Sequence, residues 1–254
     1  MRTSSTNRNR LAFSTTELLV IVAVIAIISG IVLRKTANDR DRARRIACVG
    51  SLKSFSMGLR LFANDAGDYP FKFLANATNV PPGLAPFSTN KASELWKLIQ
   101  VAQNDISSPR ILSCPSDLAR RTADSFGTNG EPDEFSHTNN RLNALSYFLS
   151  LDADEAQPGN ILAGDRYLTT DPETSSERTT KFLFGQQNVV SDSPTAKSVR
   201  WISTIHNGGG NAAFMDGSAR RLGTEELRQM LKQQPAAANR IWLPNSDATG
   251  RGNP

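Results

Sequence analysis

The chain opens with an apolar stretch and then changes to an amphipathic pattern, with no helix-breaking residue between the two. Residues 18–33 contain no charged side chain, and Glu17 stands directly before them. Proline is absent from residues 13–64, so the pattern predicts one long helix over these residues. The helix is expected to end at Gly67, which suits a left-handed cap, ahead of Pro70, which cannot continue it.

The two halves of this predicted helix face different surroundings. The first half is apolar on all sides, as a helix in lipid is. Its 16 uncharged residues fall short of the roughly 20 that span a bilayer, and the small residues before Glu17 extend it to about that length. The second half carries one apolar stripe at spacings of four and three residues, which predicts a helix covering the core of a soluble domain. The stripe consists of Cys48, Leu52, Phe55, Leu59 and Phe62.

The rest of the chain alternates between short strand-like runs and polar turns. A helix is predicted over residues 91–103, a polar surface loop over 117–140, and a closing amphipathic helix over 224–234. Asp216-Gly217 inside the last strand-like run predicts a two-residue hairpin. Strands are predicted within residues 110–117, 143–153, 161–170, 181–185, 199–206 and 211–222. The expected fold class is therefore α+β, with a long N-terminal helix on a small antiparallel sheet.

Composition excludes some functions. The net charge is +5, and removing the three arginines of the first twelve residues would leave only +2, which is too mild to predict a nucleic-acid partner. The two cysteines and two histidines include no closely spaced pair, so no zinc site is expected.

The N-terminus resembles the class III signal of type IV pilins and type II secretion pseudopilins. A basic tail, Phe13 and Glu17 stand at that family's spacing. The resemblance implies cleavage by a prepilin peptidase between Ala12 and Phe13 and methylation of Phe13, which makes Glu17 the fifth residue of the mature chain. The family usually has glycine before the cut, where this chain has Ala12.

This resemblance implies a pilin-like fold and a structural role without catalysis. Residues 1–12 would be the leader, 13–34 the membrane-spanning and filament-core half-helix, and 35–254 the periplasmic domain, in a single-pass inner-membrane protein. The implied partners are the prepilin peptidase, other pilin-like subunits, an inner-membrane assembly platform and the lipid bilayer. In the filament, Glu17 would pair with the N-terminal amine of a neighbouring Phe13.

A second resemblance lies near the C-terminus. His206, nine residues and then Asp216-Gly217 are similar to the H-x9-DG signature of a subgroup of pilin-like proteins, which also has a mid-helix cysteine and a C-P-x-D element. Here those correspond to Cys48 and to residues 114–117. A catalytic pair of His206 with Asp216 is one interpretation. If the glycines at 208–210 formed a hairpin, however, Asp216 would lie about 17 Å along the strand, which favours a turn role for Asp216 and a loop-fixing role for His206.

Two further sites stay open at this stage. Cys48 and Cys114 are either a disulfide or two separate buried thiols. Asp152, Asp154 and Glu155, with the later Asp165, offer carboxylates to calcium, although their spacing is not that of an EF-hand and a solvated turn is the favoured interpretation. No other cofactor is expected.

Three alternative interpretations remain. The apolar run with its basic start also fits an ordinary secretory signal peptide. A signal-anchored periplasmic binding protein would use Trp201, Trp242 and Tyr167 to hold a glycan, although scattered tryptophans belong more often to a core. A hydrolase on a pilin-type anchor would have His206 at its centre.

Overall fold

The structure is a computed structural model that describes residues 14–72, 95–151, 153–169, 185–188, 199–206, 208–233 and 240–243. The expected cleavage site at Ala12 and Phe13, the calcium candidate Asp152 and most of the predicted strand 181–185 lie outside these residues. The chain forms two compact units, Met1–Ala43 and Arg44–Pro254.

The predicted long helix is confirmed as α1, Thr15–Ala66. In the first unit, Glu17 lies in its first turn and accepts a hydrogen bond of 3.2 Å from the backbone N–H of Ser14. The large apolar side chains that follow, from Leu18 to Ile28, are between 45% and 71% exposed. In the second unit, Gly67 caps α1 at φ +89°, and its N–H donates to the carbonyl of Ala63. A left-handed glycine therefore ends the helix, as the sequence predicts.

The second unit is built on an antiparallel sheet, which confirms the α+β class. Within the described residues, six strands lie in the order β4-β8-β1-β2-β6-β7, and β3 and β5 form a separate antiparallel pair. The strands of the large sheet are β1 Tyr147–Ser150, β2 Ile161–Asp165, β4 Gly185–Asn188, β6 Gly209–Phe214, β7 Ala219–Gly223 and β8 Arg240–Leu243. The short pair consists of β3 Leu168–Thr169 and β5 Arg200–Trp201.

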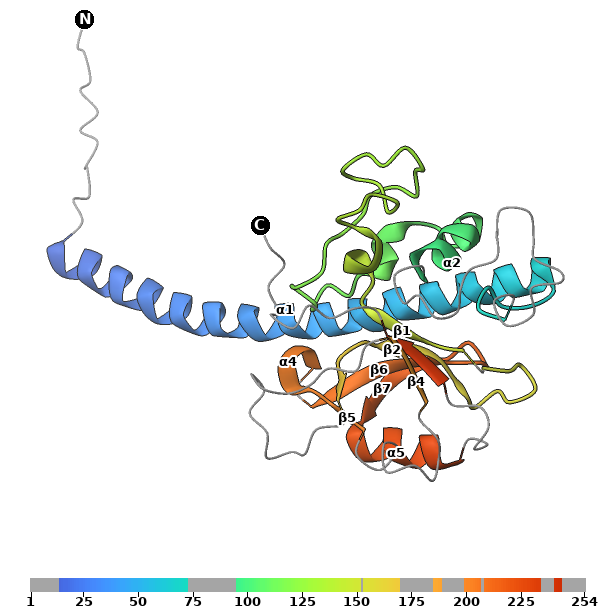
Figure 1. The fold of residues 1–254 in the computed structure, drawn as a ribbon. Helices are drawn as coiled ribbons and strands as arrows, with labels where there is room; N and C mark the ends of the chain where they lie inside the picture. The colour runs from blue at the N-terminus through green and yellow to red at the C-terminus, as the bar shows by residue number, and fades with distance from the viewer. Residues whose placement is uncertain are drawn as a thin grey trace, which may run out of the picture. The chain divides into compact units, whose positions relative to one another are not determined.

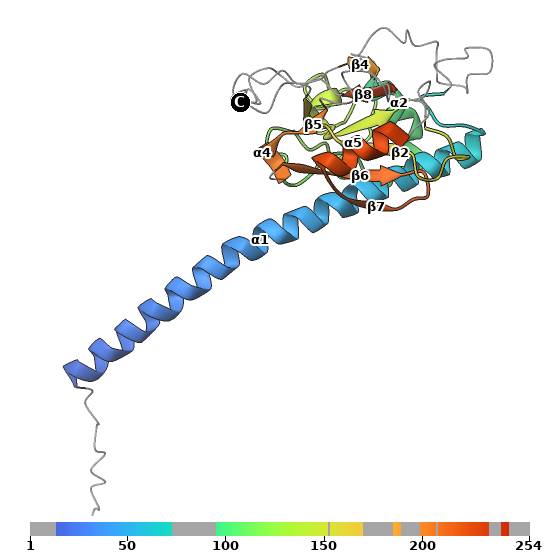
Figure 2. The same ribbon diagram turned by 90° about the horizontal axis from the view of Figure 1, so that it is seen from below.

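Successive side chains along β1 point to opposite faces of the sheet, and an apolar cluster lies on each face. Tyr147 and Leu149 of β1 pack in the cluster that contains the stripe of α1. Phe148, between them, packs in a second cluster with Trp201 and with Leu227 of α5, Thr224–Gln233. Figure 1 shows the sheet with the later part of α1 on one side and α5 on the other, and Figure 2 shows α5 against the strands from below. The stripe is fully buried, with the exposure of each side chain at 6% or less, for Cys48, Leu52, Phe55, Leu59 and Phe62.

Two predicted elements before the sheet are shorter or different. The helix predicted over 91–103 is α2, Leu95–Val101, which continues as a 3-10 turn over Ala102–Asn104. The strand predicted within 110–117 is wrong: Pro109–Leu112 forms a 3-10 helix, with proline in its first turn and the Ser108 side chain accepting from the N–H of Arg110. A proline and a capping serine favour a helical start over a strand.

The segment 117–140, predicted as a surface loop, is partly buried. Phe135 and Ala123 are 0% exposed, and Glu134 and Asn140 are buried as well. The Glu134 carboxylate accepts hydrogen bonds from the N–H groups of Gly130 and Glu131. Burial raises the pKa of Glu134, but these two hydrogen bonds, together with those from the Ser136 hydroxyl and the Asn129 backbone, outweigh burial and lower the pKa overall. The polar composition thus serves internal hydrogen bonds, which a polarity pattern cannot distinguish from solvation.

The glycine run does not form a hairpin turn. The strand predicted over 199–206 ends at Trp201, and α4, Ser203–His206, follows. Gly208 adopts φ +73°, and β6 then begins at Gly209. A Cβ on Gly210 would lie 2.5 Å from the ring of Trp201, so glycine is needed there for close packing. A hairpin joins β6 to β7 at Asp216-Gly217, as the Asp-Gly pair predicts, but its loop has three residues and not two. The N–H of Gly217 donates to the carbonyl of Phe214, the N–H of Phe214 donates to the carbonyl of Ser218, and Gly217 has φ +83° at the end of the loop.

One helical stretch of the described residues, Asp39–Ala66, is long and apolar enough to cross a membrane, and Thr15–Gly30 is a shorter apolar helix. Of the apolar window within Asp39–Ala66, 44% is buried inside the protein. Leu52 and Phe55 lie in that stretch and pack in the domain core, so lipid does not contact them in the folded domain.

Candidate functional site: the buried cluster around the disulfide

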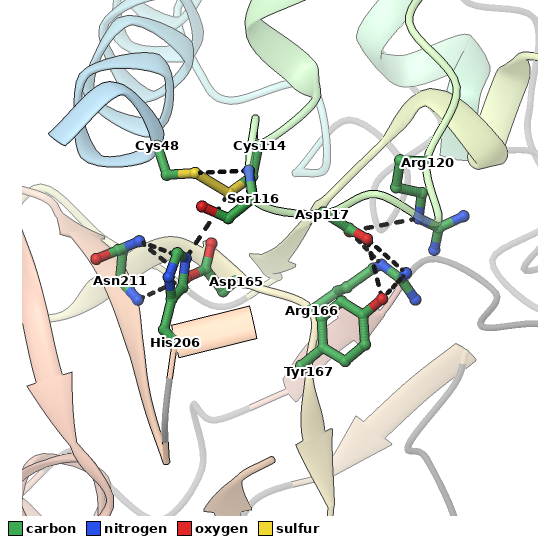
Figure 3. Close-up of a disulfide and its surroundings, with 10 residues drawn as sticks. All are labelled: Cys48, Cys114, Ser116, Asp117, Arg120, Asp165, Arg166, Tyr167, His206 and Asn211. Atoms are coloured by element: carbon green, nitrogen blue, oxygen red, sulfur yellow. Dashed lines mark hydrogen bonds and ion pairs between the residues drawn. A yellow bond between two sulfur atoms is a disulfide. The ribbon is translucent and has the colours of Figure 1, made fainter. Parts of the chain in front are cut away.

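A disulfide joins α1 to the segment that precedes the sheet. Cys48 of α1 and Cys114, which follows the 3-10 helix Pro109–Leu112, are bonded across 66 residues of chain, and both are at most 1% exposed. The backbone N–H of Ser116 donates to Cys48 Sγ at 3.4 Å. Figure 3 shows this disulfide with a group of polar side chains below it. Of the two interpretations left open by the sequence, the structure has the disulfide.

His206 lies directly against the disulfide. Its Nε2 is 3.7 Å from Cys114 Sγ and 3.3 Å from Asp165 Oδ2, and the side chain is 3% exposed. The guanidinium of Arg221, on β7, donates to the backbone carbonyl of His206 at 2.6 Å. That bond fixes the end of α4, which places the imidazole in the cluster (Figure 3).

Asp165 and Asn211 complete the cluster. The backbone N–H and the side-chain amide of Asn211 donate to Asp165 Oδ2 at 2.7 and 3.0 Å, and the amide is 3.2 Å from His206 Nε2. Asp165 is 3% exposed, and its Oδ1 is a buried atom with no hydrogen-bond partner among the described residues. A buried acceptor left in this state is costly and therefore calls for an explanation.

The carboxylate beside His206 is Asp165 and not Asp216. Asp216 lies in the β6–β7 turn, where its Oδ1 accepts the N–H of Ser218 at 2.8 Å. Hydrogen bonds from the Ser218 side chain and backbone lower the pKa of Asp216. Sequence reasoning missed this pairing because it depends on the antiparallel register of β2 and β6. The available signal was only an aspartate, Asp165, inside a predicted strand. In this chain the H-x9-DG element spans the end of α4, the whole of β6 and its turn.

The aspartate of the C-P-x-D element belongs to a second buried group. The guanidinium of Arg166 donates to both oxygens of Asp117, at 2.8 and 3.1 Å, and the Tyr167 hydroxyl donates to Asp117 at 2.9 Å (Figure 3). Burial, together with the charge of Asp117, raises the pKa of Tyr167 to about 12, against the opposing effect of Arg166. Asp117 thus anchors the cysteine-bearing segment to the residues that follow β2. Because both oxygens of the Asp117 carboxylate are already bonded to neighbouring side chains, we assign this buried carboxylate a structural role.

Among the described residues, the calcium candidate Asp165 lies apart from Asp154 and Glu155. Asp154 Oδ1 accepts the N–H of Ala156 at 3.1 Å, and Glu155 accepts the hydroxyl of Tyr69 at 3.2 Å. Burial, and then the charge of Glu155, raises the pKa of Tyr69. Both acids line a cavity of about 360 Å³ beside the end of α1, whereas Asp165 belongs to the cluster at the disulfide. The group of three close metal-ligand side chains in the described part of the chain is instead Cys48, Cys114 and His206. Chain spacing gave no sign of this group, because the fold brings together residues that lie far apart in the chain.

Two of the three aromatic residues considered for glycan binding are buried. Trp201 is 2% exposed and Tyr167 is 7% exposed. The third, Trp242, belongs to β8, and its backbone pairs with that of Leu149 in β1. The first two therefore contribute to the core and to the Asp117 group.

Comparison with known proteins gives no relative from which a function can be transferred. No family model, no curated protein and no solved structure matches this chain.

Proposed function

We propose that this chain is a structural subunit of a filament of the type II secretion or type IV pilus kind, processed by a prepilin peptidase between Ala12 and Phe13. The observation that carries the proposal is the division of α1. Its N-terminal part combines exposed apolar side chains with a single carboxylate in the first turn, and its later part forms one wall of the domain core.

The exposed apolar side chains of α1 need a partner. Nine large aliphatic side chains from Leu18 to Ile28 are each at least 45% exposed. A contiguous apolar surface of this kind is unfavourable in water by about 25 cal/mol for each Å². A bilayer before assembly, and neighbouring helices after assembly, would both bury it.

Glu17 has a place in the same proposal. Its contact among the described residues is the N–H of Ser14, so the carboxylate remains available to a cationic partner. A carboxylate at the edge of an apolar segment is costly and is usually kept for a function. We propose that Glu17 forms an ion pair with the N-terminal amine of Phe13 in a neighbouring subunit. Within an apolar helix bundle, this ion pair would set the register between the helices.

The disulfide supports a location outside the cytoplasm. Structural disulfides form and persist in oxidising compartments such as the periplasm. The bond between Cys48 and Cys114 lies in the domain that the proposal places there.

Processing and assembly can be tested separately. The full chain is expressed with a prepilin peptidase and the assembly proteins of a filament system, and the mature N-terminus is read by mass spectrometry. Methylated Phe13 is the expected result, and an intact Met1 start contradicts it.

The role of Glu17 in assembly is tested by substitution. Glu17→Gln removes the charge at nearly constant size, and Thr16→Ala is the control. Glu17→Gln should insert into membranes like the wild type but yield at least about 10-fold fewer sheared filaments, as loss of about 1.4 kcal/mol per contact would produce. Equal filament yields would refute the role of Glu17.

The two enzyme-like or binding alternatives have less support. A carboxylate–imidazole pair such as Asp165–His206 is the arrangement of a general base. However, Nε2 of His206 already faces the carboxylate, Asn211 and the disulfide, and the side chain is 3% exposed, so this nitrogen is engaged within the protein. The burial of Trp201 and Tyr167 likewise removes two of the three rings proposed for a glycan site.

A further inference from the structure

The cluster at the disulfide contains more ligand chemistry than a structural cross-link requires. The ligand atoms of Cys48, Cys114 and His206 all lie within 4.8 Å of one another, and all three residues are buried. Asp165 adds a carboxylate 3.3 Å from the imidazole nitrogen, and its second oxygen is buried with no hydrogen-bond partner in the part of the chain that the structure describes. Two sulfurs, one imidazole and one carboxylate are a ligand set suited to zinc.

We propose that, when the disulfide is reduced, Cys48, Cys114, His206 and Asp165 bind one divalent ion of the zinc class. The disulfide and the ion exclude each other, because the ligand of the metal is the thiolate. The proposal is independent of the proposed filament function, since it concerns only the side chains of this cluster.

The spacing of the ligands matches a tetrahedral site. With Zn–S near 2.3 Å and Zn–N or Zn–O near 2.0–2.1 Å, neighbouring ligand atoms are about 3.5 Å apart for N and S and about 3.3 Å apart for N and O. Nε2 of His206 is 3.7 Å from Cys114 Sγ and 3.3 Å from Asp165 Oδ2. In such a site the two sulfur atoms would lie about 3.8 Å apart. They must therefore move apart from their bonded distance, which reduction of the disulfide permits.

Surrounding groups would hold these ligands in place. The N–H of Ser116 already points at Cys48 Sγ, where it would stabilise a thiolate. Two hydrogen bonds from Asn211 orient the Asp165 carboxylate, and Arg221 fixes the backbone of His206. Partners that orient metal ligands are typical of metal sites and contribute to affinity.

The local charge also suits a divalent ion. Two thiolates and a carboxylate carry three negative charges, so a bound divalent ion leaves one. A cavity of about 130 Å³ beside the cluster is lined by His206 and Asn211 and by the guanidinium-bearing residues Arg45 and Arg221. Those cations would offset the remaining charge.

The redox step balances with a dithiol reductant. One thiolate of the reductant attacks a sulfur of the disulfide, so the bond between Cys48 and Cys114 breaks and one cysteine leaves as a thiolate. The second thiol of the reductant then attacks the mixed disulfide, closes the reductant's own disulfide and frees the other cysteine. The cysteines gain two electrons and two protons while the reductant becomes a disulfide. Metal binding then displaces the two thiol protons. In either state α1 stays cross-linked to the segment before β1, by the disulfide when oxidised and by the ion when reduced.

Cobalt(II) is the probe for this site, because its spectrum reports thiolate ligands and tetrahedral geometry. The full chain in detergent is reduced anaerobically with a trialkylphosphine, which takes up the oxygen of water as it reduces the disulfide, and is titrated with Co²⁺ and then with Zn²⁺. The reduced chain should bind one equivalent of Co²⁺ with thiolate charge-transfer bands, and Zn²⁺ should remove these bands. The oxidised chain should show neither.

Variants separate this site from adventitious binding. Cys114→Ser and His206→Gln should each weaken Co²⁺ binding at least about 10-fold, and Asp165→Asn should weaken it about 10-fold while the thiolate bands remain. Asp154→Asn, an acid outside the cluster, is the control and should bind as the wild type does. The proposal is overturned if reduced and oxidised chains bind alike, if His206→Gln keeps wild-type affinity, or if the reduced chain binds no Co²⁺.

Unfolding on reduction is also informative. Should the reduced chain lose its near-ultraviolet circular dichroism, recovery of that signal on adding Zn²⁺ supports the site, because metal binding then drives folding. Failure to recover the signal counts against it.

Discussion

Two leucines on the same helix provide a direct test of how α1 packs in the domain. Leu59 is 1% exposed in the core cluster, whereas Leu61, two residues later, is 54% exposed. We predict that Leu59→Ala destabilises the domain strongly and that Leu61→Ala does not. The two substitutions remove the same atoms from the same helix and differ in the face that they affect.

The magnitudes follow from burial. Leucine to alanine removes the equivalent of three methylene groups, which contributes about 2.4 kcal/mol when the site is fully buried. A residual cavity at Leu59 adds to this and brings the loss to about 3 kcal/mol, within the usual range of 2–5 kcal/mol. At Leu61 about half of the side chain is already in solvent, no closed cavity forms, and alanine is the better helix former, so the loss is about 1 kcal/mol or less.

The measurement is urea unfolding of the full chain at a fixed detergent concentration. Tryptophan fluorescence reports on the domain, because Trp96 and Trp201 pack in it, and it is insensitive to helix retained in the micelle. Equal losses of stability for the two variants, or a loss below about 1 kcal/mol for Leu59→Ala, would refute the packing of this helix face.

Three further predictions concern the disulfide, the glycines and the turn. Replacing Cys48 and Cys114 together by serine should lower the free energy of unfolding by about 2–5 kcal/mol under oxidising conditions, as measured in urea, and an unchanged midpoint would show that the bond contributes little. Gly210→Ala should lower the free energy of unfolding in urea by roughly 1–3 kcal/mol, because the new methyl group meets the facing tryptophan ring. Gly50 has open space around it inside α1, so Gly50→Ala should raise the same free energy by up to about 1 kcal/mol. Hydrogen bonds within its own turn lower the pKa of Asp216, so its contribution to stability is present above its unfolded pKa and is lost as the pH falls through the lower folded value. Asp216→Asn keeps a residue that suits the turn, so its melting temperature should fall less than that of the wild type between pH 7 and pH 3; equal falls would contradict this.

Local pattern was sufficient for the elements whose cause lies in neighbouring residues. The buried stripe of α1, its end at Gly67 and the Asp216-Gly217 hairpin follow from spacing and from backbone preference, and the structure has all of them. The same holds for α5, where Leu227 and Leu231 form a buried face at helical spacing. The predicted strand within 110–117 failed because the proline and serine at its start favour a helical turn.

The sequence by itself determined where α1 begins to bury side chains, where it stops, and that an antiparallel sheet follows it. Only the tertiary structure decided that Asp165 pairs with His206, that Cys48 reaches Cys114, and that Gly210 admits a tryptophan ring. The physical reason is range. Helical and strand periodicities, caps and turns depend on residues within a few positions of one another, whereas the cluster joins residues from α1, the segment before β1, β2 and β6 through sheet register and helix packing, which no local pattern specifies.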